Sequence, residues 1–145
     1  MKLQQIAPLI QKYMPMLNAE SLVYQEILNF YGDNSLIEPN IDELESFLLP
    51  RRLFNIIKIQ AKTAEACVQE LHQKHPCFTE AAGMLRYYTT AEDANWADIE
   101  KAENAIGKSL AMDIYDWKPD VFTVFKKEGV EGCELVIILA FGSGD

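Results

Sequence analysis

The side chains best suited to chemistry are His72, His75 and Cys77, which form the pattern H-x-x-H-x-C. Two side chains three residues apart on a helix can share a metal ion, and imidazole together with thiolate suits zinc. No second Cys/His pair completes the usual set of four ligands. Polar side chains are also favoured near a helix C-terminus, where the helix dipole stabilises them. We therefore expect no metal and no cofactor at this position.

A cysteine nucleophile activated by a histidine is the second chemistry that this run suggests. Residues as close together as His75 and Cys77 rarely align for proton transfer on a turn, and no family signature surrounds them. Fingerprints of serine hydrolases, P-loops and dinucleotide-binding loops are missing. Cys67, Cys77 and Cys133 are an odd number of cysteines without a regular spacing, which is typical of reduced cytosolic thiols. We expect no catalytic residues and no enzyme.

A more specific pattern is MDIYDWKPD at 112–120, where Tyr115 and Trp117 stand among three aspartates. The aspartates lack the glycine and the final glutamate of an EF-hand loop. Tyrosine and tryptophan supply much of the binding energy at protein interfaces, and surrounding acids select a basic partner. The alternative is that both aromatic rings anchor the core at a helix–strand junction.

The charge is distributed unevenly along the chain. Its net charge is −9, and residues 80–145 hold thirteen acids against six bases. An acidic half repels nucleic acid and anionic membranes and favours a basic protein partner, although solubility alone would also explain it. The expected partner-binding residues are Glu100, Glu103, Asp113, Tyr115, Asp116, Trp117 and Asp120.

The length and hydropathy of the chain predict one cytoplasmic domain, residues 1–145. The sequence has no apolar run of about 18 residues or more, which a membrane span needs. Its N-terminal residues also lack the continuous apolar stretch and small-residue cleavage site of a signal peptide.

The elements expected to position these residues are mostly helical. The run from Pro50 to His75 holds no further proline and no glycine, and its apolar residues recur at intervals of three and four. This spacing predicts one long central helix at about 50–75. Shorter helices are expected at 2–14, 19–31, 41–48, 79–88 and 91–111. The narrow apolar stripe of the last of these consists of Trp96, Ile99, Ala102, Ile106 and Leu110.

The pattern changes in the C-terminal part of the chain. The runs VFTVF at 121–125 and ELVIILAF at 134–141 are rich in β-branched and aromatic residues, and KKEGVEG lies between them. This arrangement predicts a β-hairpin at about 121–141. The expected fold is therefore α+β and predominantly α-helical, with five to six helices around the long central helix and a C-terminal β-hairpin.

In size, acidity and missing catalytic motifs, the whole chain resembles the small immunity proteins of bacterial toxin systems, including those of contact-dependent inhibition. The resemblance implies a non-catalytic protein that binds a basic cognate toxin, such as a nuclease, and blocks its active site. It carries over no individual site residue. Two alternatives stay open: a small enzyme with an unrecognised active site, and a regulatory or adaptor subunit in a homo-oligomer such as a homodimer.

Overall fold

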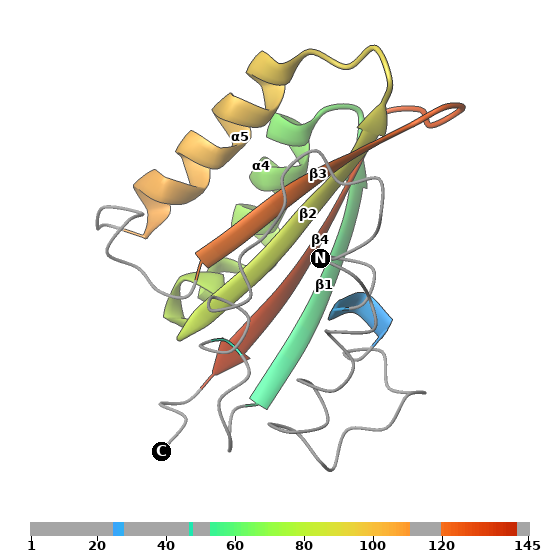
Figure 1. Ribbon diagram of the computed structural model, residues 1–145. Coiled ribbons are helices and arrows are strands. Elements are labelled where there is room, and N and C mark those ends of the chain that lie inside the picture. The colour runs from blue at the N-terminus through green and yellow to red at the C-terminus, as the bar shows by residue number, and fades with distance from the viewer. Residues whose placement is uncertain (1–24, 28–46, 48–52, 111–119, 142–145) are drawn as a thin grey trace.

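The computed structural model describes residues 25–27, 47, 53–110 and 120–141 of the chain. Residues 25–27 and 47 are helical. The remaining elements are β1 (Leu53–Ala61), α4 (Ala64–Lys74), the 3-10 helix η1 (Pro76–Glu80), β2 (Gly83–Ala91), α5 (Trp96–Ser109), β3 (Asp120–Lys127) and β4 (Cys133–Phe141). In this part of the chain the strands form one four-stranded sheet, and α4 and α5 lie together on one face of it (Figure 1).

The strand order is β1-β4-β2-β3. β4 runs antiparallel to both of its neighbours, and β2 pairs in parallel with β3. Parallel neighbours require a crossover connection, and α5 supplies it between β2 and β3. Because β4 lies between β1 and β2, the last of the described strands is in the interior of the sheet.

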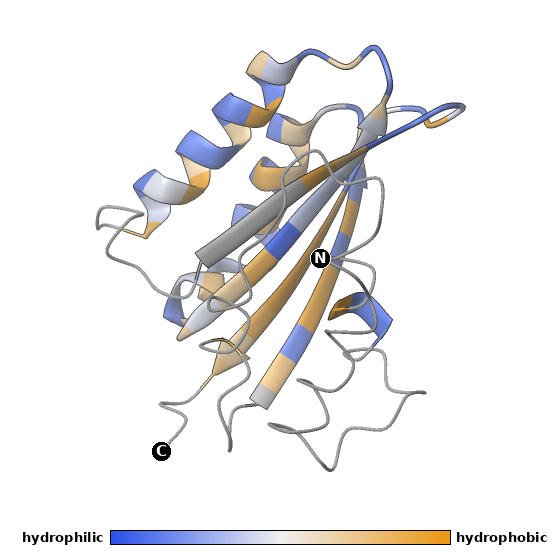
Figure 2. Cartoon of the chain, viewed as in Figure 1, coloured by the Kyte–Doolittle hydropathy of each residue, from blue (hydrophilic) through white to orange (hydrophobic). Residues whose placement is uncertain are grey.

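Side chains of β4 alternate between two covered faces. Cys133, Leu135, Ile137 and Leu139 belong to the core cluster shared with α4 and α5. Val136, Ile138 and Ala140 are also buried, and they point to the opposite face because successive residues of a strand alternate. A strand covered on both faces has a nearly continuous apolar sequence, which is why β4 is hydrophobic along most of its length (Figure 2).

The helices contribute one apolar side each to this core. From α4 the buried residues are Ala64, Cys67, Val68 and Leu71, and from α5 they are Ile99, Ala102 and Ile106. On the other face of the sheet, the Phe47 ring lies 5.3 Å from that of Phe54 in β1. The side chains of Phe47 and Ile27 are fully buried.

The expected long helix at 50–75 is wrong, because the chain forms β1, a break and then α4. In β1 the buried residues Ile57 and Ile59 alternate with the exposed residues Lys58 and Gln60, which is the two-residue period of a strand. Thr63 then caps α4, and its side-chain oxygen accepts a hydrogen bond from the Ala66 amide at 3.0 Å. The apolar residues recur at intervals of three and four only by coincidence, because the run consists of a strand followed by a helix.

The expected C-terminal hairpin is also wrong. Strands do form there, as β3 and β4, but β2 lies between them in the sheet. The residues expected to form a helix at 79–88 instead form η1 and most of β2, where Leu85, Tyr87 and Tyr88 suit a covered strand. The helix expected at 91–111 is α5, which begins later because Asn95 rather than Thr90 caps it.

A predominantly helical protein with five to six helices around a central one is therefore the wrong fold class for this chain. The described residues instead form a mixed sheet, and α4, α5 and η1 connect its strands along the chain. The helices expected at 2–14, 19–31 and 41–48 lie outside the described residues, apart from positions 25–27 and 47. No helix among the described residues is long and apolar enough to cross a membrane.

Candidate functional site

The histidine–cysteine run at the end of α4 is divided between the core and the surface. His72 Nδ1 donates to the Val68 carbonyl oxygen at 2.8 Å, and Nε2 is hydrogen-bonded to the Ser109 hydroxyl on α5. The His72 ring also meets the Phe78 ring edge-on, with centroids 5.3 Å apart. His75 and Cys77 are exposed. His72 therefore joins α4 to α5, and the described residues contain no group of three or more candidate metal ligands.

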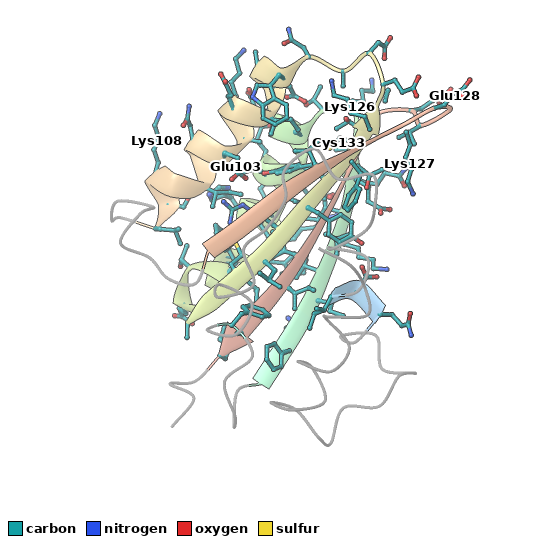
Figure 3. All side chains as sticks on the ribbon, in the orientation of Figure 1. Glu103, Lys108, Lys126, Lys127, Glu128 and Cys133 are labelled. Carbon is teal, nitrogen blue, oxygen red and sulfur yellow. The ribbon has the colours of Figure 1, made fainter. Side chains whose placement is uncertain are left out.

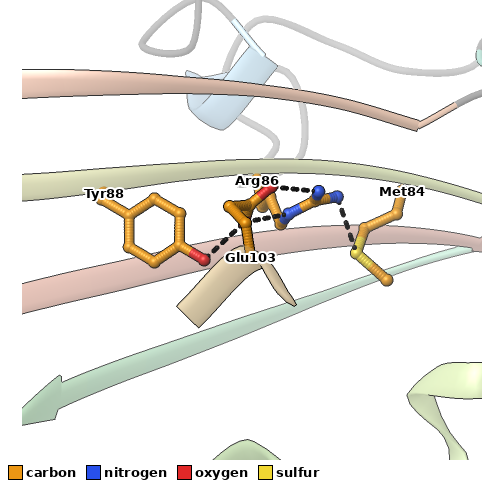
Figure 4. Close-up of polar contacts among 4 residues, drawn as sticks. All are labelled: Met84, Arg86, Tyr88 and Glu103. Carbon is orange, nitrogen blue, oxygen red and sulfur yellow. Dashed lines mark hydrogen bonds and ion pairs between the residues drawn. The ribbon is translucent and has the colours of Figure 1, made fainter. Parts of the chain in front are cut away.

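A buried ion pair joins β2 to α5. The Arg86 side chain is completely buried, and its Nε donates to Glu103 Oε2 at 2.8 Å while its second terminal nitrogen contacts Oε1 (Figure 4). The Tyr88 hydroxyl donates to the same Glu103 Oε2 at 2.6 Å. Burial, and then the negative charge of Glu103, raise the pKa of Tyr88 well above its ordinary value. Glu103 thus accepts hydrogen bonds from a buried cation and a buried phenol.

A second polar group lies on the opposite face of the sheet. The Tyr87 hydroxyl donates to Glu26 Oε2 at 2.5 Å, and Lys58 Nζ lies 2.6 Å from Glu26 Oε1. The hydrogen bond and the charge of Glu26 raise the pKa of Lys58. Glu26 is almost fully buried, whereas about half of the Lys58 side chain is exposed. This group attaches the short helical segment 25–27 to β1 and β2.

Asp98 connects α5 to the first turn of α4. Its carboxylate on α5 accepts hydrogen bonds from the amides of Ala64, at 2.7 Å, and Glu65, at 3.1 Å. These amides belong to the first turn of α4, where backbone N–H groups have no partner within the helix. A carboxylate there also interacts favourably with the positive end of the helix dipole. Asp98 is therefore a capping residue supplied by a different helix.

The residues expected to bind a partner lie in different parts of the fold. Glu100 is exposed on α5, whereas Glu103 is engaged by Arg86 and Tyr88. Asp120 is the first residue of β3 and pairs with the beginning of β2, while α5 begins after the end of β2. Glu100 and Asp120 thus lie toward opposite ends of the sheet. Asp113, Tyr115, Asp116 and Trp117 lie outside the described residues, so their role stays a prediction.

Trp96 is the large apolar side chain that the described part of the chain leaves exposed, at 38%. The helical stripe assigned it to the core together with Ile99, Ala102, Ile106 and Leu110, all of which are buried. Trp96 differs because it is the first residue of α5, directly after the Asn95 cap. The position of the cap was the signal that would have separated Trp96 from the buried stripe.

Acidic residues surround Trp96 in the sequence and on the helix. Glu92 and Asp93 are exposed in the loop before α5, and Glu100 is exposed one helical turn after Trp96. We call these four residues the Trp96 surface. The loop is fastened to β3 by Lys126, whose Nζ donates to the Ala94 carbonyl oxygen at 3.3 Å. Figure 3 shows Lys126 and Glu128 at this end of the molecule and Lys108 toward the other end of α5.

No protein-family model matches the chain, and no curated protein matches it. Solved structures of FtsZ from M. jannaschii do resemble it. An empty FtsZ dimer gives a TM-score of 0.56 at 14% identity over 92% of this chain. A single-residue FtsZ mutant gives 0.58 at 12% identity over 98% of it. The chain spans less than half of these FtsZ chains, 43% and 42%.

A structure of GDP-form protofilaments of Bacillus thuringiensis serovar israelensis TubZ gives a TM-score of 0.47 at 15% identity, covering 91% of this chain and 39% of that one.

The likeness to FtsZ concerns the fold, which is a mixed sheet with helices rather than a helical bundle. It overturns the expectation that this chain is predominantly α-helical.

Proposed function

We propose that this chain is a non-catalytic protein-binding module with the fold of part of FtsZ, and that it binds a basic protein through the Trp96 surface. The observation that carries the proposal is the exposure of Trp96 among Glu92, Asp93 and Glu100. That the chain is not an enzyme, and that it works in the cytoplasm, are parts of this proposal.

Each core side chain that could take part in catalysis has a structural role instead, and this supports the proposal. Glu103 holds Arg86 and Tyr88, Asp98 caps α4, and His72 bridges the two helices. A side chain whose hydrogen-bonding atoms are already engaged is poorly placed to bind and transform a substrate. These contacts favour a function on the surface of the fold.

Trp96 has the properties of an interface anchor. Tryptophan is enriched among residues that dominate binding energy, since a large rigid ring buries much apolar area with little loss of side-chain entropy. Exposed Glu92 and Asp93 precede the ring in the sequence and exposed Glu100 follows it by one helical turn, and such carboxylates raise the association rate of a positively charged partner. Asn95 fixes the start of the helix, and its side-chain oxygen accepts from the Ala97 amide at 2.9 Å. The anchor therefore sits on a rigid element.

A basic partner is favoured over a second copy of the chain, although the FtsZ structure that resembles it is a dimer. At a net charge of −9, two copies repel each other, and docking one acidic surface on another increases that repulsion. The same charge disfavours nucleic acid and anionic membranes. That the basic partner is a toxin stays a prediction.

The proposal is tested by capturing proteins from the source organism's lysate on four forms of the chain. These are the wild type, Trp96→Ala, a Glu92→Lys/Asp93→Lys/Glu100→Lys triple variant, and Lys108→Ala as a control at the other end of α5. Circular dichroism first establishes that all four are folded. Each captured protein is then purified, and its association and dissociation rates are measured at two salt concentrations.

We expect one basic protein to be retained by the wild type and by Lys108→Ala. Trp96→Ala should dissociate about 30-fold faster, which corresponds to a loss of about 2 kcal/mol. The triple variant should associate more slowly, with an effect that shrinks at high salt because exposed charges are then screened. If the folded variants bind every captured protein with wild-type rates, or if sedimentation shows a stable homodimer that Trp96→Ala separates, the proposal is wrong.

A further inference from the structure

The outer edge of β3 carries backbone groups that no strand among the described residues pairs with. β3 is last in the order β1-β4-β2-β3, and all eight of its residues, Asp120–Lys127, pair with β2 on its other side (Figure 1). An edge strand presents a row of N–H and C=O groups to which another extended chain can bind. At about 3.3 Å per residue, this edge is about 26 Å long.

We propose that the basic partner adds an extended segment to the outer edge of β3, as a further strand next to the Trp96 surface. Strand addition is a recurring mode of recognition, in which main-chain hydrogen bonds give affinity and side chains give specificity. The inference rests on the proposed function for the charge of the partner, and it adds the conformation that the partner adopts. It also adds contact area, because the four residues of the Trp96 surface are far fewer than the roughly 20–30 per side of a stable interface.

The end of β3 is continuous with the Trp96 surface. Lys126 Nζ donates to the Ala94 carbonyl oxygen at 3.3 Å, which joins β3 to the loop before α5. The last pair between β2 and β3 is Ala91 with Lys127, and the two acidic residues of that loop follow Ala91 directly. A segment that runs along β3 therefore comes next to these carboxylates where the strand ends.

The edge is already extended and held in place before any partner binds. Val124 belongs to the core shared with the helices, and on the other face the Phe125 ring meets that of Tyr87 edge-on, with centroids 5.4 Å apart. The loop after β3 ends at Gly132, which has a φ of +75° and packs so closely on β1 that an added Cβ would lie 2.5 Å from the Ala61 carbonyl oxygen. A pre-formed binding edge loses little conformational entropy when a partner binds.

The lysines at the end of β3 leave its α5 side open to a basic segment. Lys126 already donates to the loop, as described above. Successive side chains of a strand alternate, so Lys127 lies on the face of Phe125, which is opposite to α5. On the α5 side, a basic segment therefore meets the carboxylates of the Trp96 surface.

The other edge of the sheet, at β1, is a poorer choice for the same partner. It lies three strand spacings from β3, or about 14 Å. β1 contains no acidic residue, and about half of its Lys58 side chain is exposed. Charge therefore favours β3, and β1 serves as an internal control.

The test uses the full chain and a short synthetic peptide, blocked at both termini, with two lysines at each end of a central run of alternating threonine and valine. One control peptide carries N-methyl groups on all its central residues, which removes their N–H donors. A second control has glutamates in place of the lysines. Calorimetry at low salt measures binding, and amide hydrogen exchange of the protein is then compared with and without each peptide.

We expect the lysine peptide to slow exchange at alternate amides of β3 and to leave the amides of β1 unchanged. At a peptide concentration about ten times Kd the slowing should be about tenfold, because these amides exchange only in the free protein. Neither control peptide should protect β3. The folded Glu92→Lys/Asp93→Lys/Glu100→Lys variant should bind the lysine peptide about tenfold more weakly, whereas Lys108→Ala should bind it like the wild type.

Strand addition is overturned if the lysine peptide protects β1 instead of β3, or only amides within 92–100. It is also overturned if the N-methylated peptide binds equally well, or if the lysine peptide does not bind at millimolar concentration. Failure of the proposed function gives a different result. In that case β3 is still protected by the peptide, but Trp96→Ala releases a captured basic protein at the wild-type rate.

Discussion

Removing the Glu103 carboxylate should destabilise the protein severely, because it leaves the positive charge of Arg86 buried. The Arg86 side chain is 0% exposed and that of Glu103 is 13% exposed, so little water can replace the lost partner. Breaking a buried ion pair from one side costs about 3–5 kcal/mol. Because Glu103 lies at the edge of the core, we expect Glu103→Ala to fall near the lower end, at about 3 kcal/mol.

Glu100→Ala is the matched control for this experiment. It removes the same side chain from the same helix, but Glu100 is exposed, so the free energy of unfolding should change by about 0.5 kcal/mol or less. Urea unfolding followed by circular dichroism measures both variants. With a slope of about 1.5 kcal/mol per molar urea, Glu103→Ala should lower the midpoint by about 2 M. Glu103→Gln is the milder substitute if Glu103→Ala does not fold.

A third variant tests whether charge is the cause. Arg86→Met/Glu103→Leu replaces the ion pair by apolar side chains, which is often neutral or stabilising for a buried pair. It should therefore recover part of the stability that Glu103→Ala loses. Equal midpoints for Glu103→Ala and Glu100→Ala would refute the buried ion pair. A double variant no more stable than Glu103→Ala would show that packing and the lost acceptor of the Tyr88 hydroxyl, rather than the unpaired charge, set the loss.

Three further predictions concern the surface, pH and the backbone. Trp96→Ala should cost about 1 kcal/mol or less, whereas Ile99→Ala one turn away should cost about 2–5 kcal/mol in urea unfolding; equal costs would place Trp96 in the core. Because the folded state raises the pKa of Tyr88, its contribution is complete below the ordinary value of 10.0 and is lost as pH rises above it. Between about pH 10 and 11 the wild type should therefore lose stability more steeply than Tyr88→Phe, by up to about 1.4 kcal/mol per pH unit, and parallel curves would contradict this. Gly132→Ala should lower the melting temperature more than Gly129→Ala, since both have positive φ but only Gly132 has a backbone atom in the way; the reverse order would refute the close contact with β1.

Local sequence was enough to identify some elements but not their partners. The β-branched and aromatic residues of 121–125 and 134–141 do form strands, and the apolar stripe of Ile99, Ala102 and Ile106 does form a buried helical face. Strand propensity reflects how side chains fit a pleated surface, so it does not state which strand lies alongside. The hairpin was the nearest pairing along the chain, whereas the structure inserts β4 between β1 and β2.

The partner-binding site predicted from the sequence, at Tyr115 and Trp117, lies outside the described residues, so it stays a prediction. The exposed ring that the structure does describe is Trp96, which the sequence had placed in the apolar stripe of the helix expected at 91–111. The helix was expected to begin at residue 91 but begins at Trp96, so Trp96 occupies its first position, where the side chain stays exposed. The meeting of Cys67 with Cys133, and of Asp98 with the start of α4, was likewise invisible to any local pattern.

The stretch at 53–61 shows most clearly what only tertiary structure decides. Leu53, Phe54, Ile57 and Ala61 satisfy a helical period when continued into 64–74, whereas the alternation at 57–60 satisfies a strand period. The sequence by itself therefore determined that the segment is apolar and not how it folds. Pairing with β4 along its whole length provides backbone hydrogen bonds that an isolated strand lacks. Those bonds come from residues more than seventy positions away, and α4 and α5 bury Ile57 and Ile59, which is why the segment forms a strand.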